Sequence, residues 1–462
     1  MKLLALPRTE DFAMLLSGLD YGEFFLEATD NLSVLFEDSK VESVGQGSDA
    51  GMSLRFLKRG GGSVQTLMSS AKGTDADTAA RLRKNLLGDQ APGRPVALEP
   101  WSFFRPPIRI APEEKSLDEK IALLRSLDVL IRAEFPHIRQ VSLSYGEGRR
   151  NLALLNSEGQ CRFQERTAVI FSVAVIVEKD GVLQTGREVA GALKGYEILE
   201  DQDPRTLARL AARRALAKLE APKAKAGEMP VILASSAGGT FIHEAIGHSL
   251  EADHVQEGSS PAYKGKIGKT VAPENLSVID DPTVPFARGS FGFDDEGVAA
   301  APTVLVKNGV LQGYLHSRAT AMEEGMASNG HGRRESYAAT PIPRMSNLYI
   351  APGPDNPAQI VKSLKSGLLV TRMGGGEVNT ATGDFVFEVD EGYRIENGVK
   401  KHLVRDANLL GVGPETLGSI DKIGWDIGWG IGTCGKNGQG VPVSDAQPTI
   451  RIPKLLVGGA HE

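Results

Sequence analysis

One apolar run limits the architecture of this chain more than any other feature. The run, AVIFSVAVIV, covers residues 168–177 and is the longest in the sequence. Its length is about half of what a bilayer-spanning helix needs. It is also rich in β-branched residues, which favour extended backbone, so it predicts a buried β-strand. We therefore expect no membrane-spanning segment and a fold built on sheets.

Strand-like stretches recur through residues 1–222, between stretches with helical patterning. A meander of antiparallel strands is expected over residues 23–57, where Asn, Asp and Gly turns separate alternating residues. Further strands are expected over residues 140–189, with turns at GEGRR (residues 146–150) and NSEGQ (residues 156–160). The pattern of this half therefore predicts an N-terminal α/β domain of antiparallel strand meanders with helices.

Helix signals in the same half are local and specific. Ser116 and Glu119 have the spacing of a capping box. Asp203 followed by Pro204 places proline in the first turn of another helix. The helices expected from these and similar signals lie near residues 11–19, 75–87, 116–133 and 203–219.

A chain of 462 residues is too long for one ordinary core, so we expect two domains. Residues 220–230, EAPKAKAGEMP, have the composition of an exposed linker or a surface loop. A boundary there gives domains of residues 1–222 and 230–462. Strands and glycine-rich turns dominate the second domain, which is expected to be mostly antiparallel β and to carry one helix with the motif described below. The fold class is therefore α+β.

Charge and cysteine usage exclude several classes of protein. The formal net charge of −6 gives no general attraction for phosphate backbones, so nucleic acid is not an expected partner. The first residues are interrupted by Pro7 and by charges, unlike a secretory signal. Two cysteines, Cys161 and Cys434, are too few for a disulfide framework. We expect a cytoplasmic protein with free thiols.

The stretch FIHEAIGHSL, residues 241–250, places Glu244 directly after His243 and a second histidine, His248, five residues after the first. The zinc-protease motif H-E-x-x-H has its histidines four residues apart. On a regular α-helix residues five apart differ by roughly 140°, compared with about 40° for four apart. A π-helical turn restores the alignment, and Gly247 tolerates such a distortion or lets another segment approach.

Two interpretations of this stretch remain open from the residues alone. The histidines and Glu244 are either ordinary helix residues or part of a metal site. A catalytic zinc needs three protein ligands, so two imidazoles leave one missing. Candidates for the third ligand are Glu251, three residues beyond His248, and Cys434, a thiol between glycines in GTCGKNGQ.

Four stretches together resemble the TldD/PmbA family of peptidases. They are HEAIGHSLEAD, GHGRRESYAATPIPRMSNLYI, GGGEVNTATGDFVFEVDEGYRIENG and GTCGKNGQGVPVSDAQPTIRI, and they fall in the second half of the chain. The resemblance implies a zinc metallopeptidase with one Zn²⁺ per chain, ligated by His243, His248 and Cys434, with Glu244 as the catalytic base. It also implies a catalytic, TldD-type subunit that pairs with a second copy or a related subunit. Substrates would be unfolded or leader peptides in an enclosed dimer cavity.

Further site residues are expected on weaker grounds. His331 and Tyr337 either donate to the oxyanion of the reaction or only pack. A peptide is expected to add as an extended strand near residues 374–383, with broad sequence tolerance, and Gly375, Gly376 and Asn379 are its candidate contacts. The alternative for those glycines is that they only shape turns.

Other functions compete with the peptidase. The chain is alternatively a peptide-binding or assembly subunit in which the metal is structural and a partner cleaves. Hydrolysis of a small amide is the third possibility.

Overall fold

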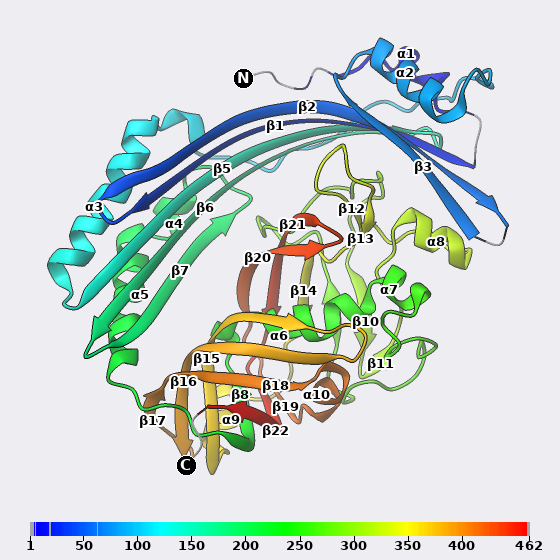
Figure 1. The fold of residues 1–462 in the computed structure, drawn as a ribbon. Coiled ribbons are helices and arrows are strands. Elements are labelled where there is room, and N and C mark those ends of the chain that lie inside the picture. The colour runs from blue at the N-terminus through cyan, green and yellow to red at the C-terminus, as the bar shows by residue number, and fades with distance from the viewer. Residues whose placement is uncertain (1–3, 5, 18–19, 62, 460–462) are drawn as a thin grey trace.

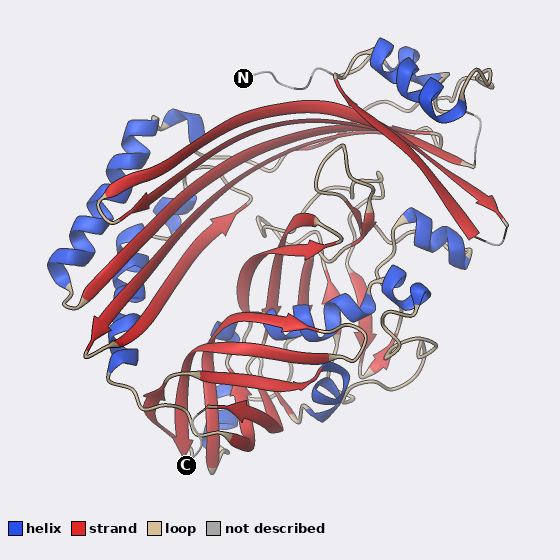
Figure 2. Ribbon diagram, viewed as in Figure 1, coloured by secondary structure: helices blue, strands red, loops and turns tan. Residues whose placement is uncertain are grey.

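A long curved sheet from the N-terminal half arches over the C-terminal half of the chain (Figure 1). The structure, a computed structural model, describes residues 4, 6–17, 20–61 and 63–459. Strands dominate both halves (Figure 2). Most strand pairs are antiparallel, so the expected α+β fold class is confirmed.

The N-terminal sheet has seven strands in the order β3-β2-β1-β5-β6-β4, with β7 beside β6. The apolar run of residues 168–177 lies inside β6, in agreement with the predicted buried strand. The strands are β1 Tyr21–Glu37, β2 Lys40–Gly60, β3 Ser63–Lys72, β4 Ser102–Phe104, β5 Ile138–Asn156, β6 Cys161–Lys179 and β7 Val182–Ala192.

The prediction of a turn at residues 146–150 in this sheet is wrong. Residues 146–150 continue β5 without interruption, and Gly146 pairs with Ser33 on one side and Ile170 on the other. The partner strands β1 and β6 satisfy the backbone groups on both edges, and this pairing overrides the local turn preference of the glycines. The second expected turn, at residues 156–160, does separate β5 from β6.

Two helices of this half begin where their predicted caps place them. Asp203 caps its helix through side-chain oxygens, and Ser116 with Glu119 forms the expected capping box. Asp75 also caps its helix, which was expected near residue 75 without a named cap. The first helix ends at Ala13, earlier than expected, and residues 18–19 lie outside the described residues. The helices are α1 Thr9–Ala13, α2 Ala76–Leu87, η1 Pro112–Glu114, α3 Leu117–Glu134, α4 Ile198–Asp201 and α5 Pro204–Leu219.

Helix α5 covers one face of the sheet through a row of alanines. Ala208, Ala211 and Ala215 are fully buried against β6 and β7. A Cβ at Gly186 of β7 would come within 2.0 Å of the Ala211 carbonyl oxygen. Small residues on both surfaces therefore allow the helix to lie directly on the strand.

Three sheets form the C-terminal half. The six-stranded sheet has the order β11-β10-β9-β14-β21-β20, the seven-stranded sheet has the order β15-β8-β22-β18-β16-β17 with β19 beside β22, and β12 pairs with β13. The strands are β8 Gly227–Leu233, β9 Val278–Asp280, β10 Thr303–Lys307, β11 Val310–Leu311, β12 Gly332–Arg333, β13 Ile342–Pro343, β14 Asn347–Ile350, β15 Ser366–Val378, β16 Asp384–Glu396, β17 Val399–Val404, β18 Ala407–Val412, β19 Lys422–Ile423, β20 Gly428–Lys436, β21 Gln439–Gln447 and β22 Ile450–Gly458.

Short helical segments connect these sheets and pack between them. They are η2 Ser235–Ala237, α6 Thr240–Ile242, η3 His243–Gly247, η4 His248–Leu250, α7 Ala252–Glu257, α8 Arg318–Glu324, α9 Pro357–Lys362 and α10 Gly413–Ser419. None of the helices in the described part of the chain combines the length and the apolar character that crossing a membrane requires.

Buried charges join the two halves. Arg55 of β2 contacts Glu23 of β1 at 3.0 Å and Glu296 of the C-terminal half at 2.6 Å, and Arg334 also pairs with Glu23. Burial by itself would raise the pKa of Glu23, but the two guanidinium groups outweigh it and lower that pKa to about 2. Because all four side chains are buried, separating the halves would expose or unpair these charges.

Segment 220–230 does not behave as a free linker. Ala224 is buried, and the backbone of Lys223 forms an isolated parallel β-bridge with the backbone of Arg405. The segment leads directly into β8, which begins at Gly227. The division into domains of residues 1–222 and 230–462 therefore stays a prediction. The segment at the boundary is packed against the rest of the chain.

Candidate metal centre

The segment with the two histidines is a composite helix. A short α-helical turn, α6, leads into the π-helical turn η3, His243–Gly247, and then into the 3-10 turn η4, which starts at His248. The π-helical turn that a metal site would require between the histidines is present. The wider turn brings residues i and i+5 to one side of the helix, so both imidazoles face the same space.

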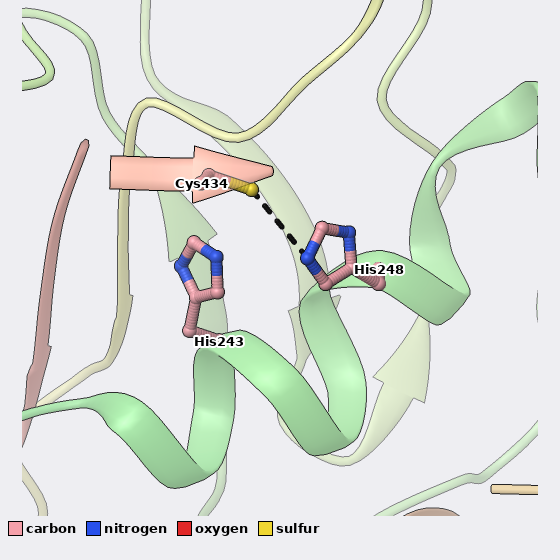
Figure 3. A group of neighbouring side chains, drawn as sticks. All are labelled: His243, His248 and Cys434. Carbon is pink, nitrogen blue, oxygen red and sulfur yellow. Dashed lines mark hydrogen bonds between the residues drawn. The ribbon is translucent and has the colours of Figure 1, made fainter. Parts of the chain in front are cut away.

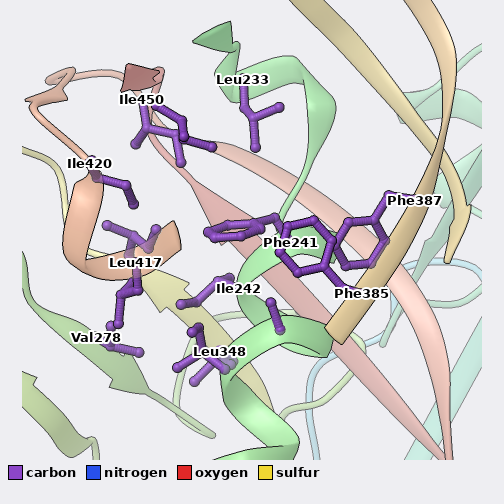
Figure 4. Packing of buried hydrophobic residues seen from close by; sticks show 14 of the residues in the cluster. Leu233, Phe241, Ile242, Val278, Leu348, Phe385, Phe387, Leu417, Ile420 and Ile450 are labelled. Carbon is purple, nitrogen blue, oxygen red and sulfur yellow. The ribbon is translucent and has the colours of Figure 1, made fainter. Parts of the chain in front are cut away.

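Apolar packing holds this segment in place (Figure 4). Phe241 and Ile242 are buried, and the Phe241 ring meets that of Phe385 edge to face, with centroids 5.9 Å apart. A Cβ at Gly247 would come within 2.0 Å of the Met345 sulfur. Glycine therefore allows close packing here, and a larger residue would have to displace the Met345 side chain.

The structure brings His243, His248 and Cys434 together. One ligand atom from each lies within 4.8 Å of those of the other two, and all three residues are buried. The two imidazole rings are nearly perpendicular, with centroids 5.3 Å apart. Figure 3 shows the thiol of Cys434 and a ring nitrogen of each histidine directed toward one another. Residues 186 positions apart thus form one cluster.

This cluster fits a zinc ion. His248 Nε2 lies 3.4 Å from Cys434 Sγ. Zinc bonds of about 2.1 Å to nitrogen and about 2.3 Å to sulfur, at a tetrahedral angle, would place those atoms about 3.6 Å apart. Two imidazoles and one thiolate are also the ligand types that zinc prefers. Three protein ligands leave a fourth position for water or substrate.

His248 is held by a carboxylate on its far side. Its Nδ1 donates to Glu251 Oε2 over 3.0 Å, which directs Nε2 toward Cys434. Glu251 is fully buried and also pairs with Lys436 Nζ at 3.1 Å. Burial would raise the pKa of Glu251, but Lys436 and His248 hold it well below its usual range. Of the two candidates for a third ligand, Glu251 therefore supports His248 from behind, while Cys434 joins the cluster.

His243 is held less tightly. Its Nδ1 is buried without a hydrogen-bond partner and lies 3.9 Å from Asp445 Oδ2. The other oxygen of Asp445 accepts a hydrogen bond from the Gly239 backbone N–H at 3.0 Å, at the start of the helical segment. Asp445 thus faces His243 as Glu251 faces His248, over a longer distance.

Electrostatics favours a thiolate at Cys434. Burial by itself would raise the thiol pKa, but the imidazoles of His243 and His248 outweigh burial and lower the pKa of Cys434 to about 5. The Cys434 carbonyl oxygen accepts a hydrogen bond from Arg344, which fixes the end of β20. The thiolate is the form that binds metals.

Glu244 lies beside the cluster without belonging to it. Its Oε2 is 3.9 Å from His248 Nε2, and its side chain keeps 27% of its surface exposed. Burial raises the pKa of Glu244. A carboxylate next to the ligands, partly open to solvent and with a raised pKa, suits a group that accepts and returns a proton.

A cavity of about 600 Å³ adjoins the cluster on the Asp445 side. The N-terminal half contributes Gly191 and Lys194 to its wall, and the C-terminal half contributes Arg288, Met373 and Gly430, among others. Asp445 also lines it and connects it to His243. The cavity therefore lies between the two halves of the chain, next to the candidate metal centre.

The glycine-rich stretch of β15 is near this cavity at one end only. Met373 and Gly374 line the cavity. A Cβ at Gly375 would meet nothing within 4 Å, whereas one at Gly376 would strike the Phe387 ring. Asn379 accepts hydrogen bonds from the backbone of the following turn, so its side chain shapes that turn.

His331 and Tyr337 are not brought to the cluster. The His331 side chain is buried and bonded to Thr303 and to the Arg344 carbonyl oxygen. The Tyr337 hydroxyl donates to Asp49 Oδ2 at 3.2 Å, on the N-terminal sheet. Neither side chain hydrogen-bonds or pairs with the cluster in the described structure, which favours the packing interpretation of both.

Three residues around the site were not anticipated from the sequence: Asp445, Lys436 and Arg288. Lys436 and Asp445 both follow Cys434 within the stretch GTCGKNGQGVPVSDAQ, two and eleven residues after it. Because side chains alternate along β20 and β21, the spacing from Cys434 offered a weak signal for Lys436. Arg288 lies in a loop with no pattern that points to the site.

Comparison with known proteins gives three matching domain profiles that together cover most of the chain. Residues 22–85 match the PmbA/TldA metallopeptidase domain 1, residues 110–219 its central domain and residues 226–459 its C-terminal domain. The candidate metal centre lies within the third match.

Curated relatives match over nearly the whole length. A protein of Methanothermobacter thermautotrophicus named metalloprotease is 34% identical, over 96% of each chain. A metalloprotease TldD homolog of Haemophilus influenzae is 32% identical, over 96% of this chain and 94% of its own. A zinc metalloprotease TldD homolog of Saccharolobus solfataricus is 32% identical, over 75% and 77%.

Solved structures share the fold at low sequence identity. TldE from Thermococcus kodakarensis superposes with a TM-score of 0.71, at 18% identity, over 98% of both chains. A Thermotoga maritima protein superposes with a TM-score of 0.75, at 21% identity, over 95% of this chain and 96% of its own.

Proposed function

Because the chain belongs to the PmbA/TldD family of metallopeptidases, we propose that it is a zinc-dependent peptidase with its metal held by His243, His248 and Cys434. The observation that carries the proposal is the convergence of these three ligand atoms within 4.8 Å, with the Glu244 carboxylate beside them. Zinc binds as one ion per chain.

A zinc ion in this position supplies a Lewis acid that activates water near neutral pH and polarises a peptide carbonyl. Glu244 follows His243 directly and lies at the open side of the cluster. Its carboxylate takes the proton of the attacking water and returns it to the leaving amine. The raised pKa of Glu244 assists the first transfer, since a base of higher pKa accepts a proton more readily near neutral pH.

Peptides bind in extended form along β15. Leu368–Val370 of β15 pair with β8, but further along β15 pairs only with β16, so the edge near Met373 and Gly374 has no described strand beside it. That edge borders the 600 Å³ cavity. A peptide strand added there would use main-chain hydrogen bonds and tolerate many side chains, as unfolded or leader peptides require. Gly375 leaves room for close backbone approach.

The active assembly is a dimer with a second copy or a related subunit, which closes the cavity around the peptide. The support for this assembly is the resemblance to the TldD/PmbA family and the shared fold of the structural neighbour TldE. We place the protein in the cytoplasm, where a reducing environment keeps the free thiols of Cys161 and Cys434 reduced.

Substitution Glu244→Gln tests the proposal because it removes the base and keeps the side-chain size. Zinc content, measured by mass spectrometry, should remain at one per chain. Cleavage of an unfolded peptide should fall about a hundredfold to ten-thousandfold, the usual contribution of a general base. Glu257→Gln, the same change at an exposed position of α7, is the matched control and should cleave like the wild type.

Two results would contradict the peptidase. One is a Glu244→Gln protein that cleaves at the wild-type rate, which would assign cleavage to a partner and leave the metal structural. The other is full activity in a zinc-free wild-type preparation. A panel of peptides and single amides of different lengths separates peptide cleavage from small-amide hydrolysis.

A further inference from the structure

The cavity beside the metal centre has four charged side chains in its wall. They are Lys194, Arg288, Arg372 and Asp445. Two of the three cations are already neutralised by carboxylates. Lys194 pairs with Asp201 at 2.7 Å, and Arg372 pairs with Glu188 at 3.0 Å and with Asp390 at 3.5 Å.

Arg288 differs from these two cations because it has no acidic partner among the described residues. Its Nη1 donates to the Gly432 carbonyl oxygen and to Thr433 Oγ1, which is 3.1 Å away. Its Nε is buried and has no hydrogen-bond partner. Burial alone lowers the pKa of Arg288, with no neighbouring carboxylate to offset it. A partly buried guanidinium with free donors in a cavity wall is unusual, since buried charges are normally paired.

The position of Arg288 relates it to the site of cleavage. The residues that its guanidinium contacts, Gly432 and Thr433, are the two that precede Cys434 in β20. Side chains alternate along a strand, so Thr433 and Cys434 face opposite sides of β20. The link to the metal centre is the cavity itself, because Arg288 shares its wall with Asp445, which lies 3.9 Å from His243. A group bound to Arg288 therefore lies in the cavity that adjoins the candidate metal centre.

We propose that Arg288 is a specificity-determining residue that binds a carboxylate of the peptide in the cavity beside the metal centre. The inference rests on the proposed peptidase function and names its preferred substrate class. Guanidinium groups bind carboxylates through their N–H donors, and the contacts of Nη1 with Gly432 and Thr433 leave Nη2 as a donor for a ligand. The carboxylate comes either from the free C-terminus of the peptide or from an Asp or Glu side chain.

Four versions of one cleaved peptide distinguish these sources. The first pair carries a free C-terminal acid or a C-terminal amide. The second pair is amidated and carries Glu or Gln within two residues of the scissile bond. The zinc-loaded wild type should have a KM about tenfold or more lower for the version whose carboxylate reaches Arg288, as expected for a charge-assisted hydrogen bond. Its kcat should change less.

The variant Arg288→Met should remove this difference in KM and leave cleavage of the neutral versions near the wild-type level. Lys194→Met is the matched control, because it removes a cation of the same cavity that is already paired. That control should keep the preference for the carboxylate. Arg288→Lys should restore part of it.

Equal KM values for all four peptides in the wild type would overturn the inference, even if Arg288→Met did not fold. So would an Arg288→Met protein that loses activity equally on charged and neutral peptides, because Arg288 would then only brace β20. Failure of the peptidase itself looks different: no peptide is cleaved by the zinc-loaded wild type. In that case calorimetric titration of the peptides into zinc-loaded Glu244→Gln still measures the carboxylate preference.

Discussion

The two imidazoles of the cluster have different surroundings on their far sides. His248 donates a 3.0 Å hydrogen bond to Glu251, which is itself fixed by Lys436. His243 faces Asp445 over 3.9 Å, too far for a direct hydrogen bond. The comparison indicates that His248 is oriented before metal binds, whereas His243 depends more on the ion itself and on helix packing for its orientation. Carboxylates behind metal-bound histidines commonly tune metal affinity.

The largest loss of zinc affinity should come from replacing Cys434, the ligand that lies beside both histidines. Cys434→Ser replaces the thiolate by a hydroxyl that stays protonated near neutral pH. Zinc affinity should fall roughly a thousandfold, because one of three strong ligands is lost. Competition with a chelator of known affinity measures the change, and Cys161→Ser, the same substitution at the distant cysteine, is the control. Retention of full zinc affinity in Cys434→Ser would remove the sulfur from the site.

The second-largest loss of zinc affinity should come from weakening the support of His248. Glu251→Gln removes the charge behind His248 and keeps an oxygen that accepts from Nδ1. Zinc affinity should fall about tenfold to a hundredfold, as for other residues that support a metal ligand. Equilibrium chelator competition measures it.

The fold must be followed in the same Glu251→Gln sample. Removing one partner of a buried ion pair also destabilises proteins, although Lys436 keeps Asp253 at 2.7 Å. Thermal unfolding of the metal-free protein separates a loss of stability from a loss of affinity. An unchanged zinc affinity in the folded variant would show that Glu251 serves the fold alone.

The smallest effect should come from Asp445→Asn. Because Asp445 lies 3.9 Å from His243 and forms no direct hydrogen bond with it, zinc affinity should fall less than about tenfold. The Asn side chain can still accept from the Gly239 N–H, so the helix start is preserved. A loss larger than that of Glu251→Gln would reverse the comparison between the two histidines.

Local signals in the sequence predicted much of this architecture. The caps at Ser116 and Asp203 predicted the starts of two helices, because a cap depends only on residues within one turn. The extra residue between His243 and His248 showed that a shared metal would need a π-helical turn, but it left open whether the turn forms. Long strands were less predictable, since the glycines of residues 146–150 are held extended by partners elsewhere in the chain.

The surroundings of the cluster depend on tertiary packing. Asp445 is 202 positions from His243, and Lys436 is 185 from Glu251, so neither contact has a signature in a single sequence. Charge type gave no help either: Lys194 and Arg288 line the same cavity, and only their partners distinguish them. His331 and Tyr337 show the opposite case. Both stand in the motif GHGRRESYAAT, yet their side chains hydrogen-bond to Thr303 and Asp49 and not to the cluster.

Cobalt substitution tests most directly whether both imidazoles and the thiol bind one cation. The metal-free protein is titrated with Co²⁺ while its absorption spectrum is recorded. We expect saturation at one equivalent per chain, strong visible bands of a tetrahedral ion and a near-ultraviolet band from thiolate-to-cobalt charge transfer that is absent in Cys434→Ser. A wild-type spectrum of weak octahedral bands without charge transfer would contradict the site.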